Sequence, residues 1–293
     1  MFELHRGMRI VGAMTVMLFA AGCGGGGDAG GEAAGDGDGG EAAAPMESPV
    51  DASTAGNISG SISFDGEAPA MEPIDMSAEP TCAEMHDQQP MTQSVLVGPD
   101  GGLANVFVYV REGLGDLEFP TPQQGVEIDQ QGCRYIPHVL GVQTGQTLVI
   151  RNSDGILHNI NAQPQQNRGF NISQPVNMTS ERSFPIQEVM IPLRCDVHGW
   201  MNAYLGVMEH PYFAVSSQDG SFDLSTLPPG DYVLEAWHER YGTQTADVTV
   251  ATGETAQVEF TFSEAMAENA DVPLAEPIDL HDHEAMQAPA ATE

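Results

Sequence analysis

The sequence has 293 residues and a formal net charge of −33, with 42 acidic residues against nine basic ones, all of them Arg. A surface this negative repels the phosphate backbone, so the composition argues against a nucleic-acid partner. It favours a basic partner, with an attraction that salt screens, but adaptation to salt or simple solubility explains it equally well. Charge alone therefore identifies no partner.

The first 22 residues have the pattern of an export signal. Arg6 and Arg9 precede an apolar run at residues 10–21, which is too short to span a bilayer. The run ends in small residues directly before Cys23, which resembles a bacterial lipobox with Cys23 as the lipid acceptor. An ordinary cleaved signal peptide is the alternative. We expect a protein of the bacterial cell envelope, lipid-anchored to a membrane and facing the periplasm or the exterior.

Two segments lack the apolar residues needed for a core. Residues 23–56 are mostly Gly, Ala, Asp, Glu and Ser, and residues 263–293 contain no Lys or Arg. We predict that the first is a disordered acidic tether and the second a disordered acidic tail. The folded part is then residues 57–262.

Short β-branched and aromatic runs between Gly, Pro, Asn and Asp predict an all-β fold with almost no helix. Residues 58–64 alternate between apolar and small or polar side chains, whereas residues 106–110 are continuously apolar, as in a strand buried on both faces. Residues 213–224 predict a hairpin about Asp219-Gly220.

The C-x2-H-x2-M motif from Cys195 to Met201 carries the clearest chemistry in the chain. Two imidazoles and a thiolate in a plane, with a weak axial thioether, are the ligands of a type 1 copper site. His198 supplies one imidazole, and His158 is the candidate for the other. Met201 is the candidate axial ligand because of its position in the loop.

The nearby Met190 and Met208 lack that loop spacing and rank behind Met201. Trp200, in the same loop, is either the surface at which electrons enter or a packed aromatic residue.

Residues 135–152 read Y-I-P-H-V-L-G-V-Q-T-G-Q-T-L-V-I-R-N, which resembles the entry strands of the cupredoxin family. The resemblance covers residues 127–208, and the short loop is most similar to the amicyanin type, with Val197 in place of a Pro. It implies a Greek-key β-sandwich with one copper ion held by His158, Cys195, His198 and Met201. It also implies that Asn159 braces the Cys195 loop by a hydrogen bond.

With Cys23 as the lipid acceptor, three cysteines remain. Cys82 and Cys133 lie in segments with no other ligand pattern, so a disulfide between them is the simplest interpretation in an exported protein, and Cys195 is then the thiol left over. Closing a loop of about 50 residues would stabilise the fold by about 4 kcal/mol in the chain-entropy model.

Residues 219–234 read D-G-S-F-D-L-S-T-L-P-P-G-D-Y-V-L, which resembles the carboxypeptidase regulatory-like (transthyretin-like) β-sandwich, also called the carbohydrate-binding-like fold. The first strands of such a sandwich are absent just before Phe213, but similar strands stand at residues 58–64 and 106–110. We therefore predict a split domain, residues 57–126 plus 209–262, interrupted by the cupredoxin domain at 127–208. Two sequential domains are the alternative.

These patterns favour an electron carrier with an unidentified redox protein partner over an enzyme, because no catalytic motif is evident. A copper-handling protein without electron transfer and an envelope carbohydrate-binding or adhesion module are the alternatives. His138, His210 and His238 could form a second metal site with Glu239, but polar bridges between the sandwiches fit their spacing better.

Overall fold

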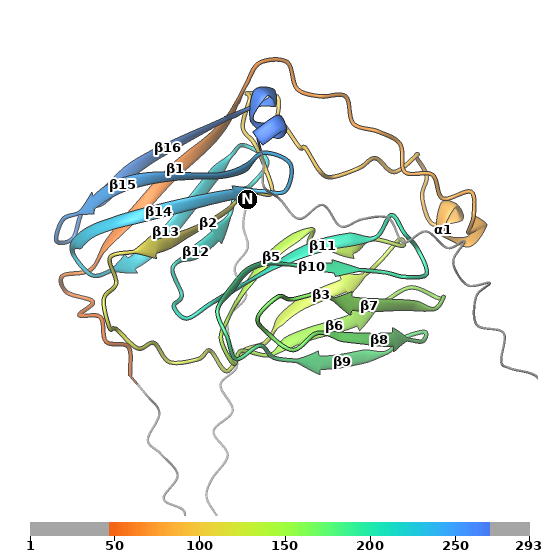
Figure 1. Cartoon of the computed structure of the whole chain (residues 1–293), viewed down its shortest axis with the longest axis horizontal. Helices are drawn as coiled ribbons and strands as arrows, with labels where there is room; N and C mark the ends of the chain where they lie inside the picture. The colour runs from red at the N-terminus through yellow and green to blue at the C-terminus, as the bar shows by residue number, and fades with distance from the viewer. Residues whose placement is uncertain (1–46, 270–293) are drawn as a thin grey trace, which may run out of the picture. The chain divides into compact units, whose positions relative to one another are not determined.

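The structure, a computed structural model, describes residues 47–269 (Figure 1). The predicted export signal, the anchor Cys23, most of the tether and most of the tail lie outside the described residues. Within residues 47–269, no helix is both long enough and apolar enough to cross a membrane. The predicted all-β fold is confirmed, since strands make up nearly all the regular structure of this part of the chain.

Strands from both ends of the described chain form one β-sandwich, here called the terminal sandwich (Figure 1). Its sheets have the orders β13-β1-β16 and β12-β2-β14-β15, and β1 pairs in parallel with β16. Ile58, Phe222 and Leu234 belong to the core that the two sheets share. The strands are β1 (Gly56–Asp65), β2 (Phe107–Glu112), β12 (Phe213–Val215), β13 (Ser221–Leu227), β14 (Gly230–His238), β15 (Gly242–Val250) and β16 (Thr255–Ser263).

The strands between β2 and β12 form a second sandwich, here called the central sandwich. Its sheets have the orders β5-β11-β10-β7-β8 and β4-β3-β6-β9. Ile128 and Ile150 from one sheet share a core with Leu193 and Leu205 from the other. The strands are β3 (Val126–Gln130), β4 (Tyr135–Ile136), β5 (Val139–Gln143), β6 (Leu148–Asn152), β7 (His158–Ala162), β8 (Phe170–Gln174), β9 (Thr179–Arg182), β10 (Glu188–Arg194) and β11 (Asn202–Met208).

The continuously apolar β2 is buried on both faces, as its sequence predicts. Val108 and Val110 belong to the core of the terminal sandwich, whereas Phe107 and Tyr109 belong to a separate cluster with residues of β5, β10 and β11. Phe107 lies so close to β11 that a Cβ on Gly206 would come within 2.4 Å of its ring. A glycine is therefore needed at that point of β11.

The turn predicted at Asp219-Gly220 is present, but the hairpin prediction is wrong. Gly220 has a positive φ of 78°, and Gly220 N donates to Ser217 O at 2.9 Å. However, β12 pairs with β2 and β13 pairs with β1, so the turn joins two different sheets. The reason is that β1 and β2, which are distant in sequence, already provide partners for these strands.

Residues 72–92, between β1 and β2, form a projecting arm that carries the short helix α1 (Pro80–Glu84). Hydrogen bonds close its base, including Thr92 N to Glu72 O at 2.8 Å. Its buried residues Ile74, Met76 and Cys82 pack in the core of the central sandwich. The arm lies inside the segment 57–126 that we predicted for the split domain, yet it contacts the other core.

Regular structure continues past residue 262, the predicted end of the folded part. The 3-10 helix η1 (Glu264–Asn269) follows β16, whereas we expected disorder from residue 263. Tyr241 donates a hydrogen bond to the Glu264 carboxylate at 2.9 Å, and Met266 packs against the core of the terminal sandwich. Contacts with residues distant in sequence hold this turn. These contacts could not be predicted from the acidic composition of the segment.

Candidate metal centre

Three strands bring the predicted ligands to one end of the central sandwich. His158 is the first residue of β7, Cys195 directly follows β10, and Met201 directly precedes β11. The end of β10 lies beside the start of β11, since Arg194 pairs with Asn202. Arg194 also pairs with Asn161 of the antiparallel β7, so the chain that leaves β10 at Cys195 continues toward the start of β7 at His158. His158 thus shares one site with the Cys195 loop, although the loop begins 37 positions later in the sequence.

His158, Cys195 and His198 form a compact group of donor atoms. One ligand atom from each residue lies within 4.8 Å of the others. The two histidine Nδ1 atoms are 2.8 Å apart, and the Cys195 Sγ lies 3.7 Å from the Nδ1 of His198. The three residues are only 0%, 3% and 2% exposed, respectively, so the donors face one another in a space closed to solvent.

A buried carboxylate orients the His158 ring. The Nε2 of His158 lies 2.8 Å from Asp154 Oδ2, which leaves Nδ1 facing the other donors. Burial favours the neutral ring, but the hydrogen bonds with Asp154 and Cys195 outweigh it and raise the pKa of His158 to about 9. A carboxylate on the far nitrogen is the usual support of a metal-binding histidine.

The thiol of Cys195 has the properties of a metal ligand. Burial opposes its ionisation, but hydrogen bonds from His158 and His198 outweigh burial and lower the pKa of Cys195 to about 6. The backbone N–H of His198 also points at Sγ, at 3.4 Å. The thiolate is the form that binds metals, and it is favoured here near neutral pH.

Asn159 connects β7 to the Cys195 loop. Its Oδ1 accepts hydrogen bonds from the backbone N–H of Asp196 at 2.7 Å and of Val197 at 3.3 Å. Its Nδ2 donates to the Asp196 carboxylate at 2.9 Å. These are the contacts expected of a residue that braces the loop, although its effect on a bound metal stays a prediction.

Met201 closes the loop through its backbone. Its N–H donates to His198 O at 2.9 Å, and its carbonyl accepts from Cys195 N at 3.1 Å. The side chain is 1% exposed and shares a core cluster with Cys195, whereas Met190 and Met208 belong to the cluster around Phe107. Met201 is therefore the methionine placed for an axial role, which also stays a prediction.

Trp200 packs over the second histidine. Its ring centroid lies 5.2 Å from that of His198, and its Nε1 donates to Cys133 O at 3.0 Å. Trp200 is only partly buried, so its packing on His198 is compatible with both interpretations and its role in electron entry stays a prediction. The Nε2 of His198 is buried and has no hydrogen-bond partner.

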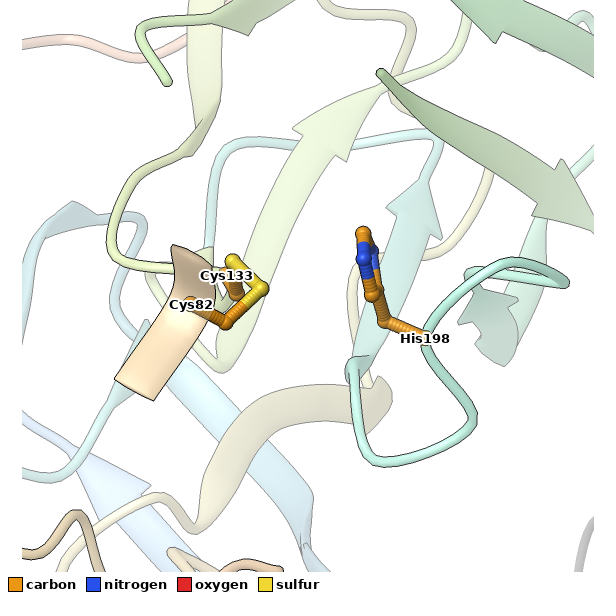
Figure 2. A group of neighbouring side chains, drawn as sticks. All are labelled: Cys82, Cys133 and His198. Atoms are coloured by element: carbon orange, nitrogen blue, oxygen red, sulfur yellow. A yellow bond between two sulfur atoms is a disulfide. The ribbon is translucent and has the colours of Figure 1, made fainter. Parts of the chain in front are cut away.

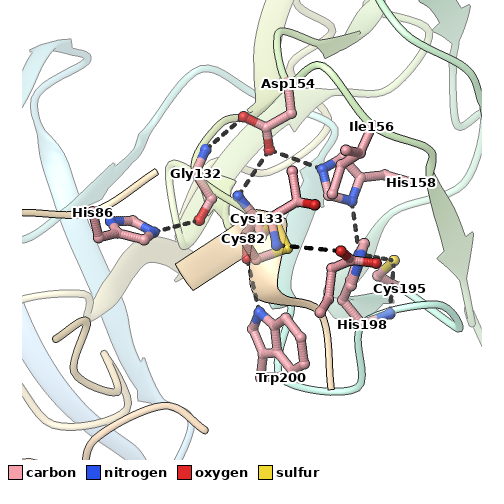
Figure 3. The surroundings of a disulfide bond; sticks show 12 residues. Cys82, His86, Gly132, Cys133, Asp154, Ile156, His158, Cys195, His198 and Trp200 are labelled. Atoms are coloured by element: carbon pink, nitrogen blue, oxygen red, sulfur yellow. Dashed lines mark hydrogen bonds and ion pairs between the residues drawn. A yellow bond between two sulfur atoms is a disulfide. The ribbon is translucent and has the colours of Figure 1, made fainter. Parts of the chain in front are cut away.

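Cys82 and Cys133 are joined by a disulfide in the structure, and their sulfur atoms lie within 4.8 Å of a ring nitrogen of His198 (Figure 2). Cys195 is the free cysteine of the described residues. Figure 3 shows the disulfide, both histidines and the residues that connect them.

The donor set fits copper. Two imidazole nitrogens and a thiolate match the trigonal plane of a type 1 site. Both Nδ1 atoms face the thiolate, and Asp154 already holds the opposite nitrogen of His158. A soft thiolate with two imidazoles disfavours the hard cations Mg²⁺ and Ca²⁺, which prefer oxygen ligands.

The other buried histidines, His138, His210 and His238, have separate surroundings and do not form one cluster. His138 Nε2 lies 2.5 Å from the Glu239 carboxylate, and His210 Nε2 lies 2.9 Å from Val110 O. His238 stacks on Tyr241 with the ring centroids 4.7 Å apart. No metal-ligand group in residues 47–269 includes any of the three. The predicted polar bridge between the sandwiches is present at His138, whereas His210 bonds within the terminal sandwich and the Nε2 of His238 has no hydrogen-bond partner.

Residues 206–263 match the carboxypeptidase regulatory-like domain family. This segment contains β12 to β16 of the terminal sandwich, and the match confirms the resemblance predicted from its D-G and L-P-P-G motifs. No curated protein matches the chain.

Several solved copper proteins align with parts of the chain. A copper-containing nitrite reductase from Thermus scotoductus shares 17% identity over 31% of this chain and 24% of its own length, with a TM-score of 0.29. A purple cupredoxin from Nitrosopumilus maritimus shares 20% identity over 28% of this chain and 98% of its own, with a TM-score of 0.25. An oxidised amicyanin variant shares 14% identity over 34% and 97%, with a TM-score of 0.27.

These scores are low, so the assignment of the metal centre rests on its own geometry. The chain spans only about a quarter of the nitrite reductase, at 24% of its length.

Sequence reasoning missed two features of the centre. One is Asp154, whose position four residues before His158 was visible but is not a known ligand motif. The other is the position of the disulfide: the bond between Cys82 and Cys133 was predicted, but not that it lies beside His198 on an arm outside the copper motif. The spacing of residues along the sequence gives no indication that the disulfide lies beside His198.

Proposed function

We propose that this chain is a mononuclear type 1 copper protein that carries single electrons between redox partners in the bacterial cell envelope. The observation that carries the proposal is the buried group of His158, Cys195 and His198, whose ligand atoms lie within 4.8 Å of one another. Bound copper would supply the one-electron couple, with Met201 as the weak axial ligand.

The surroundings of the site support transfer rather than catalysis. All three donor residues are at most 3% exposed, which leaves little space for a substrate beside them. Loop and strand contacts already hold them together, because Asn159 binds the Cys195 loop and Asp154 holds His158. A preorganised site of this kind changes oxidation state with little rearrangement. The proposal therefore includes no enzymatic activity.

Location and partners belong to the same proposal. The signal-like residues 1–22 and the lipobox-like Cys23 support export and a lipid anchor. The partner would be a redox protein whose identity the charge does not specify, and the net charge of −33 argues against nucleic acid.

The test is to load the purified full-length chain with copper and record visible absorption and electron paramagnetic resonance. We expect a strong thiolate-to-copper band, lost in Cys195→Ser and in His158→Gln. His210→Gln is the matched control, because it replaces a buried histidine whose Nε2 bonds to Val110 O, outside the donor group. It should keep the band.

A copper-loaded protein without the band, or a Cys195→Ser variant that retains it, would refute the proposal. A colourless protein that binds only copper(I) would instead favour the copper-handling alternative.

A further inference from the structure

All three residues of the donor group are buried. His158, Cys195 and His198 are 0%, 3% and 2% exposed, respectively. A cavity of about 350 Å³ lies between the arm and the loop, and Trp200 and Met201 are among its lining residues. None of the three donor residues lines it. Open space therefore reaches the loop but stops short of the donors.

The arm, residues 72–92, lies against this end of the central sandwich and is attached at two points. The disulfide joins Cys82 of α1 to Cys133 in the turn between β3 and β4. Next to it, His86 Nε2 lies 2.8 Å from Gly132 O. Ile74 and Met76 anchor the arm in the central core.

Cys133 is also connected to both histidines (Figure 3). Its backbone N–H donates to Asp154 Oδ2 at 2.8 Å, and the same oxygen lies 2.8 Å from His158 Nε2. Its carbonyl accepts from Trp200, which packs on His198. The disulfide sulfur atoms themselves lie within 4.8 Å of a His198 ring nitrogen (Figure 2).

We propose that the disulfide-attached arm is a cover that controls access to the donor group. A molecule from solvent reaches Cys195 or a metal bound there only when the arm separates from the central sandwich. The disulfide makes that separation rare, because Cys82 and Cys133 cannot move apart. Access then follows the free energy of local opening rather than simple diffusion.

The cover adds a means of retaining the metal to the proposed function. This metal-retaining role rests on the proposed copper site. A centre behind such a cover exchanges its metal slowly. Slow exchange suits a carrier that keeps one copper ion through many electron transfers, and it does not suit a protein that delivers copper to others.

The first experiment uses the metal-free full-length chain and needs no copper. The rate at which Cys195 reacts with a chromogenic aromatic disulfide is measured at one fixed pH, and the signal of Cys195→Ser is subtracted to remove any contribution from Cys23. In the double variant Cys82→Ser/Cys133→Ser, we expect a rate at least about tenfold higher, since local opening limits the reaction.

Two further variants separate the cover from general loosening. Ile74→Ala weakens the packing of the arm but keeps the disulfide, and we expect a smaller increase in rate. It also keeps the test decisive if the double serine variant does not fold. Val258→Ala is the matched control, because Val258 is 7% exposed in the core of the terminal sandwich and should leave the rate unchanged.

The second experiment measures how fast an excess of chelator removes copper from the loaded full-length chain, for the same variants. Faster removal from the arm variants than from Val258→Ala supports the cover. If Cys195 reacts equally fast in all variants, or copper leaves all of them at one rate, the cover does not exist. If copper never gives the thiolate band, the proposed function fails, while the Cys195 reaction still tests the cover.

Discussion

The substitution Asp154→Asn tests whether a buried ion pair orients His158 in the metal-free protein. Asp154 is 5% exposed, and its carboxylate accepts from Gly132 N at 2.7 Å, Cys133 N at 2.8 Å and His158 Nε2 at 2.8 Å. Burial raises the pKa of Asp154, but these hydrogen bonds outweigh it and hold the pKa below its usual value. The amide keeps the shape of the side chain but removes its charge.

The magnitude follows from the pKa of His158. A rise from 6.5 to about 9 corresponds to about 3 kcal/mol in favour of the charged ring. Asp154 and Cys195 share that effect, so Asp154 accounts for about 1 to 2 kcal/mol of it. Because the folded pKa is raised, this stabilisation is complete below pH 6.5 and is lost as the pH rises through about 9. The variant also weakens the hydrogen bonds from the backbone N–H groups of Gly132 and Cys133. This adds a loss of stability that does not depend on the titration of His158.

The assay is urea unfolding of the metal-free wild type and variant at about pH 6 and about pH 9.5, on either side of the His158 titration. We expect Asp154→Asn to lower the free energy of unfolding by about 3 kcal/mol at the lower pH and by about 1 to 2 kcal/mol less at the higher pH. Nuclear magnetic resonance should also show a lower pKa for His158.

Asp196→Asn is the matched control, because the Asp196 carboxylate accepts hydrogen bonds from the side-chain amides of Asn159, Asn161 and Asn171 and no histidine is its partner. Asp196→Asn should lower the free energy of unfolding by the same amount at both pH values. If Asp154→Asn also lowers the free energy of unfolding by the same amount at both pH values, the ion pair is refuted.

Three other sites test the scaffold: Glu188, His238 and the contact between Gly206 and Phe107. The Glu188 carboxylate accepts backbone N–H groups from residues 165–167, so Glu188→Gln should lower the urea-unfolding free energy by about 2 to 4 kcal/mol; no loss would contradict this. Burial lowers the pKa of His238 to about 4, so the native state resists protonation and stability falls as the pH drops from 6.5 to 4. His238→Phe should lose less stability over that range in thermal unfolding, and an equal loss would show that His238 is not responsible. A Cβ on Gly206 would lie 2.4 Å from Phe107, so Gly206→Ala should cost about 1 to 3 kcal/mol, and Phe107→Leu should restore part of it if the clash is the cause.

The residue types of the metal centre could be predicted from local sequence. Cys195, His198 and Met201 stand in one short loop, where spacing alone keeps them together. The all-β fold was equally predictable, because alternation and turn residues act over a few positions. In β2 even the two-sided burial could be predicted, since Phe107, Val108, Tyr109 and Val110 leave no polar face.

Strand pairing was harder to predict, because it depends on distant partners. The Asp219-Gly220 turn has the sequence of a hairpin, yet β1 and β2 provide other partners for the strands on either side. Local turn chemistry specifies the reversal of the chain, while the partners of each strand depend on which cores its side chains can fill.

The sequence by itself determined the donor atoms, the thiol available for metal and the β-rich scaffold. Only the tertiary structure decided their surroundings: Asp154 behind His158, the Trp200 ring on His198, and the arm attached by Cys82 and Cys133. The physical reason is that a ligand's chemistry belongs to its own side chain. Its burial, orientation and pKa depend on neighbours that the fold brings from elsewhere in the chain.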